Sequence, residues 1–156
     1  MKRTYVIAAL IFLMTGCSWE VTFFIYNLTN EPVTIQYVLK IPSEGQIGVF
    51  KTNPEIFSIT SKADEIILTK KTDGKIEFDE QKKMVTARLG GKEALDLGTA
   101  HRNFMIDKLE DRKGVCSNLE QLIIIKNEAD TLTCKGSLAH LLLTELKTHA
   151  YGIKIE

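Results

Sequence analysis

The stretch Val21-Thr22-Phe23-Phe24-Ile25-Tyr26 and the stretch Val33-Thr34-Ile35-Gln36-Tyr37-Val38-Leu39 that follows it decide the fold. In the second stretch apolar and polar residues alternate with one break, which is typical of a half-buried strand. The first stretch is apolar on both faces and predicts a more central strand. The link 27–32 is rich in turn formers, and its proline can begin a strand without a backbone N–H. We therefore predict that the two strands form one hairpin.

Further short apolar runs follow at the spacing of strands, and glycine, asparagine and proline stand between them. The pair Asp73-Gly74 lies between two such runs and predicts a tight hairpin there. These additional predicted strands are 46–50, 56–60, 65–70, 75–78, 84–89 and 94–97.

The last third of the chain is less regular. Residues 104–106 fit a strand or a helix, and the polar run 107–114 predicts a loop. Residues 122–125 predict a buried strand, with 131–134 pairing back onto it. Alternation near the end of the chain predicts a final strand. Before it, Ser137 is a candidate helix cap, and the apolar face of that helix would carry Leu138, Leu141, Leu142 and Leu146.

Many short strands with turn residues between them indicate a mainly β protein. We expect a single β-sandwich, immunoglobulin-like or similar, with one short helix near the C-terminus. An α+β open sheet is the alternative. The chain without its first 16 residues has the length of one ordinary domain.

The N-terminus has the layout of a secretory signal peptide. Lys2 and Arg3 precede an uncharged apolar stretch at 5–14, and small residues follow it. A spanning helix needs about 20 apolar residues, roughly twice the length of this stretch. A signal sequence is therefore the better interpretation.

The segment Leu13-Met14-Thr15-Gly16-Cys17 resembles the lipobox of bacterial lipoproteins, although Met14 stands where leucine is usual. The resemblance implies cleavage before Cys17, diacylglyceryl transfer to its sulfur, and acylation of the new amino terminus by a fatty acid such as palmitate. The expected organisation is a removed signal peptide at 1–16, a lipidated tether at 17–20 and one β-rich domain at 21–156. Two or three acyl chains hold a protein firmly to a bilayer.

Two details of the tether bear on location. Ser18 rather than aspartate follows Cys17, which in lipoproteins of enteric type implies sorting to the outer membrane, on its periplasmic or outer face. In a Gram-positive host the anchor would lie in the cell membrane. The three residues before Val21 reach only about 10 Å, so we expect the domain to lie against the membrane, with Trp19 at the interface.

Charge excludes two classes of partner. Removal of residues 1–16 takes away two basic side chains, which leaves 18 basic and 20 acidic ones from the 20 of each kind in the full chain. Nucleic-acid binding requires a strongly basic surface, and electrostatic binding to anionic lipid requires a cluster of basic residues. We expect neither in the mature protein.

Cysteine use agrees with export. Once lipid occupies Cys17, Cys116 and Cys134 remain as a pair in an oxidising compartment and are disulfide candidates. Closing their loop of about 19 residues would contribute roughly 3 kcal/mol. The alternative is two unrelated thiols.

No sequence motif names a reaction, a cofactor or a metal. Cys116 with His140 or His149 would make a nucleophile and base, but nothing nearby supports that pairing. Three acids, Asp107, Glu110 and Asp111, could offer carboxylates to calcium, but basic residues at 108, 112 and 113 lie among them. A solvated loop of mixed charge is therefore the simpler interpretation. We therefore expect no catalytic residue, no metal and no cofactor.

Phe24, Tyr26 and Tyr37 form a candidate aromatic binding patch if they face outward, although aromatic residues are more often part of a core. The favoured hypothesis for function is a non-catalytic module, lipid-anchored in the cell envelope, that binds an envelope protein or has a structural role. The alternative is a lipoprotein that binds a small ligand or a glycan, and an envelope enzyme is the third and least favoured hypothesis.

Overall fold

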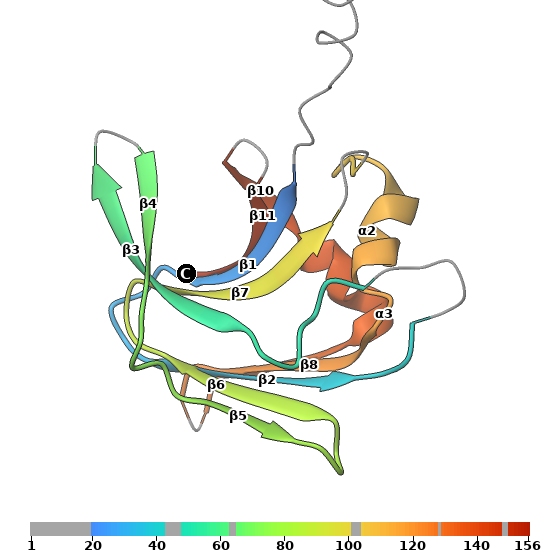
Figure 1. The fold of residues 1–156 in the computed structure, drawn as a ribbon, viewed down its shortest axis with the longest axis horizontal. Coiled ribbons are helices and arrows are strands. Elements are labelled where there is room, and N and C mark those ends of the chain that lie inside the picture. Colours follow the sequence, from blue (N-terminus) through green and yellow to red (C-terminus); the bar gives the residue numbers. More distant parts are fainter. Residues whose placement is uncertain (1–19, 43–47, 63–64, 101–103, 128, 148–149) are drawn as a thin grey trace, which may run out of the picture.

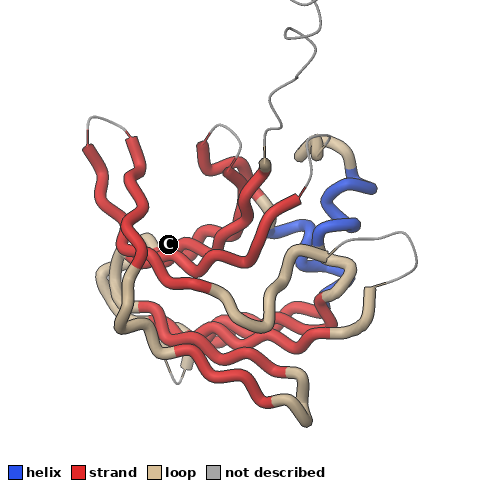
Figure 2. Tube along the Cα trace, viewed as in Figure 1, coloured by secondary structure: helices blue, strands red, loops and turns tan. Residues whose placement is uncertain are grey.

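The protein is a sandwich of two β-sheets with short helices at one end (Figure 1). The computed structural model describes residues 20–42, 48–62, 65–100, 104–127, 129–147 and 150–156. Figure 2 shows that strands make up most of the described chain. The mainly β sandwich expected from the sequence is confirmed.

One sheet has six strands in the order β10-β11-β1-β7-β3-β4, and the other has five in the order β5-β6-β2-β8-β9. The strands of the six-stranded sheet are β1 (Val21–Asn27), β3 (Glu55–Lys62), β4 (Glu65–Lys70), β7 (Glu93–Ala100), β10 (Thr144–Lys147) and β11 (Ala150–Ile155). Those of the five-stranded sheet are β2 (Val33–Leu39), β5 (Ile76–Asp79), β6 (Met84–Leu89), β8 (Leu119–Ile125) and β9 (Thr131–Lys135).

Strand β1 is central, as predicted. It pairs in parallel with β11 and antiparallel with β7. Phe23 and Ile25 point into the core between the sheets, whereas Phe24 and Tyr26 belong to a second apolar cluster on the other face of the same sheet. A strand with apolar residues on both faces can be buried on both, which explains the unbroken apolar run.

The predicted hairpin of β1 and β2 is wrong, because the two strands lie in different sheets. Strand β2 pairs with β6 and β8 instead. The link between β1 and β2 bonds to neighbouring segments of the six-stranded sheet: Leu28 donates to Ile155, and Lys92 donates to Thr29. The turn-forming residues of the link therefore connect a strand of one sheet to a strand of the other.

The predicted hairpin at Asp73-Gly74 is also wrong. Strand β4 pairs with β3 in the six-stranded sheet, and β5 pairs with β6 in the other. Ile66 and Leu68 pack on the second cluster, but Ile76 packs on the main core. The apolar residues before and after the turn thus bury against different surfaces, and the chain changes sheet between them.

Other strand predictions are confirmed. Strands β3 to β7 cover predicted runs, β9 pairs back onto β8, and the last residues form β11 in the middle of a sheet. Of the predicted strand 46–50, residues 46–47 lie outside the described residues and 48–50 are not in a strand.

The helical segments differ from the prediction. The predicted loop contains α2 (Leu109–Val115), whose last residue is buried. The late helix is only α3 (Gly136–Ala139) followed by the 3-10 turn η1 (His140–Leu142). Ser137 lies inside α3, and Lys135 holds the N-cap position without a side-chain bond. The leucines expected on one helical face therefore separate: two are exposed, one packs on the main core and one, in β10, packs on the second cluster.

The helices lie at the end of the sandwich where β1 begins. Val21 pairs with Ala100, the last residue of β7, and the chain reaches α2 soon afterwards. Phe104 packs edge-on against Phe23 and Tyr151, with both pairs of ring centroids 5.0 Å apart. Figure 1 shows the start of β1 and α2 at the same end. Within the described residues, none of the helices has the length and apolar character that crossing a bilayer requires.

Candidate functional site

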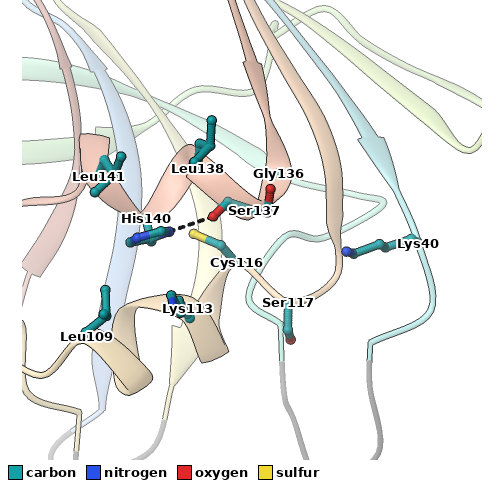
Figure 3. A pocket seen from close by; sticks show the side chains of 10 residues that line it. All are labelled: Lys40, Leu109, Lys113, Cys116, Ser117, Gly136, Ser137, Leu138, His140 and Leu141. Carbon is teal, nitrogen blue, oxygen red and sulfur yellow. Dashed lines mark hydrogen bonds between the residues drawn. The ribbon is translucent and has the colours of Figure 1, made fainter.

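A half-open groove of about 600 Å³ lies between the helices, and we call it the α2–α3 groove (Figure 3). A volume of this size is in the range of ligand-binding sites. Its lining comes from the end of β2, from α2 and the turn after it, and from α3 and η1: Lys40, Leu109, Lys113, Cys116, Ser117, Gly136, Ser137, Leu138, His140 and Leu141.

The floor of the groove is held by the turn that connects α2 to β8. Ser117 and Leu119 donate backbone bonds to Gly114 and Cys116, which closes that turn. The Asn118 side chain donates to the carbonyl of Phe50 at 2.8 Å and accepts from its N–H at 3.3 Å. These bonds tie the turn to a segment that is distant in sequence, so the position of the floor depends on tertiary contacts.

The upper wall is held by close contact between α3 and β8. A Cβ atom on Gly136 would lie 1.8 Å from the carbonyl oxygen of Leu119, so only glycine fits there without movement. This contact fixes where α3 leaves the sheet. The positions of the α3 and η1 side chains follow from it.

The rim of the groove is unusually apolar for an exposed surface. Leu109 is 44% exposed, Leu138 is 50% exposed and Leu141 is 61% exposed. Met105, in the turn before α2, is 48% exposed. Scattered exposed apolar residues are ordinary, but a contiguous group marks an interaction site more often than chance.

Two lysines supply the positive charge of the groove. Lys40 and Lys113 line it, and no carboxylate is among its lining residues. In the described part of the chain neither lysine forms an ion pair. Figure 3 shows the ammonium group of Lys40 directed toward the middle of the groove from the side opposite the leucines. The groove thus combines exposed leucines with two lysines: Lys40 lies opposite the leucines, and Lys113 lies on α2 beside Leu109.

Cys116 and His140 both line the groove, but their chemistry is that of packed residues. Burial raises the pKa of the Cys116 thiol to about 12, and the nearby Cys134 adds to the rise. The thiol is therefore protonated at neutral pH and is a poor nucleophile. His140 is buried, and its Nδ1–H donates to the carbonyl of Ser137 at 2.8 Å. That bond connects the imidazole to its own helix rather than to the thiol.

The predicted disulfide between Cys116 and Cys134 is not present, and both cysteines are free thiols. Cys116 is buried in the main core, and half-buried Cys134 packs against the same core from the edge strand β9. The Sγ of Cys134 lies 3.3 Å from the carbonyl oxygen of its neighbour Lys135. The two thiols therefore lie near each other on the same core without being bonded.

We expect the two thiols to differ in reactivity. In the native protein at pH 8, alkylation of Cys116 should be at least about a hundredfold slower than that of an exposed cysteine, because burial limits both access and thiolate formation. Cys134, which is less buried, should react first. Timed iodoacetamide labelling with peptide mass spectrometry measures both rates. Labelling in urea is the control, where the rates should converge; equal rates in the native protein would contradict the burial of Cys116.

The candidate aromatic patch does not exist as a surface. Tyr26 and Tyr37 are 0% and 1% exposed, and Phe24 is 6% exposed. Tyr37 lies in the main core, and its hydroxyl donates a hydrogen bond to the carbonyl of Lys51. Phe24 and Tyr26 pack in the second cluster, on the face of the six-stranded sheet that points away from the main core. Burial raises the pKa of Tyr26 to about 12. All three residues are part of the hydrophobic core.

Two acidic residues of α2 have structural roles. Asp111 accepts a backbone bond from Met105 at 2.9 Å, which closes the turn before the helix. Glu110 and Asp111 lie in the first turn of α2, where their negative charges interact favourably with the helix dipole. Among the described residues no group of three or more His, Cys, Asp or Glu side chains is arranged to hold a metal ion.

Sequence patterns did not identify the groove. Leu138 and Leu141 were assigned to the apolar face of a helix, and Leu109 lay in a predicted loop. The available signal was that too many apolar residues occur near 138–142 for one short helix to bury. Comparison of the chain with protein-family models, with curated proteins and with solved structures finds no match.

Proposed function

We propose that this protein is a non-catalytic interaction module, anchored by lipid at Cys17 in the cell envelope. The observation that carries the proposal is the closeness of the predicted lipidation site to a central strand. Strand β1 begins at Val21, in the middle of the six-stranded sheet, with β11 and β7 on its two sides. Because so few residues separate Cys17 from this strand, lipid on Cys17 would hold the whole domain at the membrane surface.

The groove supports binding rather than covalent chemistry. Its thiol has a pKa raised to about 12, and its imidazole Nδ1–H donates to a backbone carbonyl. Its most exposed side chains are leucines, which contribute to recognition through burial of apolar area. A protein partner would have to lie in or on the same membrane, because the tether has little reach.

Purification of the tagged full-length protein from cross-linked native membranes tests the proposal. We expect one envelope protein at near-stoichiometric amount, identified by mass spectrometry. The Cys17→Ala variant, released from the membrane, should lose it, and the lipidated protein should lose it too when a long flexible linker is placed before Val21. Unchanged recovery with the linker would contradict the need for proximity.

The α2–α3 groove favours one second candidate, the binding of a small ligand or a glycan. The groove has a volume of about 600 Å³ and is lined by exposed leucines and two lysines. If no protein is recovered from membranes, screening of anionic small molecules and glycans against the purified protein becomes the deciding measurement. Slower hydrogen exchange of the groove residues in the presence of a bound compound would favour this candidate.

A further inference from the structure

We propose that the helical side of the domain rests on the lipid bilayer to which the chain is anchored. The contacting surface, which we call the leucine face, consists of Met105, Leu109, Leu138 and Leu141. This inference rests on the proposed anchor at Cys17. It goes beyond that anchor because it names the surface of the folded domain that contacts lipid.

The first argument is where the tether ends. Val21 pairs with Ala100, and Phe104 packs on Phe23 at 5.0 Å, so the turn before α2 lies beside the first residues of β1. Met105 directly follows Phe104, and Leu109 begins α2. The end of the sandwich that the anchor would pull toward the bilayer is therefore the end that carries the first two members of the leucine face (Figure 1).

The second argument is reach. Four residue steps separate Cys17 from Val21, and an extended chain spans at most about 14 Å over that distance. A lipidated Cys17 lies at the membrane interface, so the start of β1 cannot lie much farther away than this. The helical side can then be laid on the bilayer by tilting the domain about its tether, without any change in the fold.

The third argument is the chemistry of the leucine face. Its members are between 44% and 61% exposed, although they are large and apolar. Leu109, Leu138 and Leu141 line one groove, which brings exposed leucines of α2, α3 and η1 to the same part of the domain. Apolar side chains at the interface enter the region between headgroups and acyl chains, as in amphipathic interfacial helices. Transfer into that region would remove their contact with water.

The fourth argument is charge. Lys40 and Lys113 lie in the same groove as the leucines, and no carboxylate lines it. Ammonium groups beside inserted apolar side chains can bind the phosphates of lipid headgroups. The groove thus matches a bilayer surface, which presents phosphates above hydrocarbon.

This orientation keeps strands β5 and β6, on one side of the five-stranded sheet, away from the membrane. In Figure 1 strands β5 and β6 lie on the side of the sandwich opposite the start of β1. Phe78 on β5 is 39% exposed and is therefore a matched reference position. A protein partner would find this sheet accessible while the leucine face is on lipid.

Depth measurement in proteoliposomes tests the inference on the full lipidated chain. Trp19, the one tryptophan of the protein, is first replaced by phenylalanine. Single tryptophans are then introduced as Leu109→Trp, Leu141→Trp and, as the control, Phe78→Trp. We expect brominated phosphatidylglycerol and phosphatidylethanolamine to quench the first two variants severalfold more than the third, with blue-shifted emission. Unchanged thermal unfolding of each variant shows that the fold is retained.

The possible failures are distinguishable. Mass spectrometry of the purified chain reports the acyl groups on Cys17, and their absence would overturn the proposed anchor together with this inference. Normal acylation with quenching at residues 109 and 141 no greater than at residue 78 would overturn the inference alone. Equal quenching at residues 109, 141 and 78 is also the result expected if a protein, rather than lipid, covers the leucine face.

Discussion

Replacement of Asn27 by aspartate is expected to destabilise the domain by roughly 3–5 kcal/mol, although the two side chains have nearly the same shape. Asn27 is fully buried at the end of β1. Its Nδ2 group donates to the carbonyl oxygens of Glu31 at 2.7 Å and Gly90 at 2.8 Å. Its Oδ1 atom accepts from the backbone N–H and the hydroxyl of Thr29. The amide therefore links three segments where the chain leaves one sheet for the other.

Aspartate can accept both bonds from Thr29 but can donate none. Its second carboxylate oxygen would face two carbonyl oxygens, so a buried negative charge would be left unpaired on that side. Urea unfolding followed by circular dichroism measures the loss. Asn53→Asp, at an exposed loop position, is the matched control and should change stability by less than about 0.5 kcal/mol. A loss at residue 27 no larger than at residue 53 would contradict the bonding described.

The Asn27→Asp variant should also be pH-dependent. Burial beside two carbonyls would raise the pKa of the new carboxyl in the folded state above its unfolded value of about 3.9. The destabilisation should therefore be complete above the raised value and should shrink as the pH falls toward about 4, because the protonated acid can donate one bond. Unfolding midpoints of the variant and the parent protein at pH 7 and pH 4.5 provide the comparison.

Replacement of Gly136 by alanine is expected to cost about 3 kcal/mol and to displace the upper wall of the groove. The new Cβ atom would lie 1.8 Å from the carbonyl oxygen of Leu119, which belongs to the backbone of β8 and cannot move alone. Helix α3 would have to move away from the sheet. Leu138 and Leu141 would move with it, so the shape of the leucine face would change as well.

Gly114 in α2 provides the matched control. A Cβ atom there meets nothing within 4 Å, and its φ is not positive. Since alanine is the better helix former, Gly114→Ala should be neutral or should stabilise the domain by up to about 1 kcal/mol. Thermal unfolding of the two variants gives the comparison. Similar stability of both variants would show that α3 does not pack on β8 as described.

Local pattern was sufficient where a segment's own residues decide its structure. Alternation in Val33–Leu39 predicted β2, and the doubly apolar run from Val21 to Tyr26 predicted a central strand. In both cases the period of side-chain burial is a property of the strand itself. The expectation of a lipid anchor at Cys17 also depends on a contiguous motif, but that motif lies outside the described residues, so the anchor stays a prediction.

Local pattern failed where the next segment could pair with more than one partner. The turn at Asp73-Gly74 suits a hairpin, yet Ile66 and Ile76 pack against different surfaces and the chain changes sheet. Similarly, Leu141 has the spacing of a helical core residue but is 61% exposed, because η1 gives way to β10 soon after it. Turn chemistry and spacing are compatible with several tertiary environments.

The sequence by itself determined that this is a mainly β chain of short strands, with a doubly apolar central strand and a lipobox-like segment just before it. Only the tertiary structure decided that β1 pairs in parallel with β11 from the other end of the chain, that Phe24, Tyr26 and Tyr37 are buried, and that α2 and α3 form a groove. The physical reason is range. Strand formation depends on neighbouring residues, whereas strand pairing and exposure depend on contacts between segments far apart in the chain, which local periodicity does not encode.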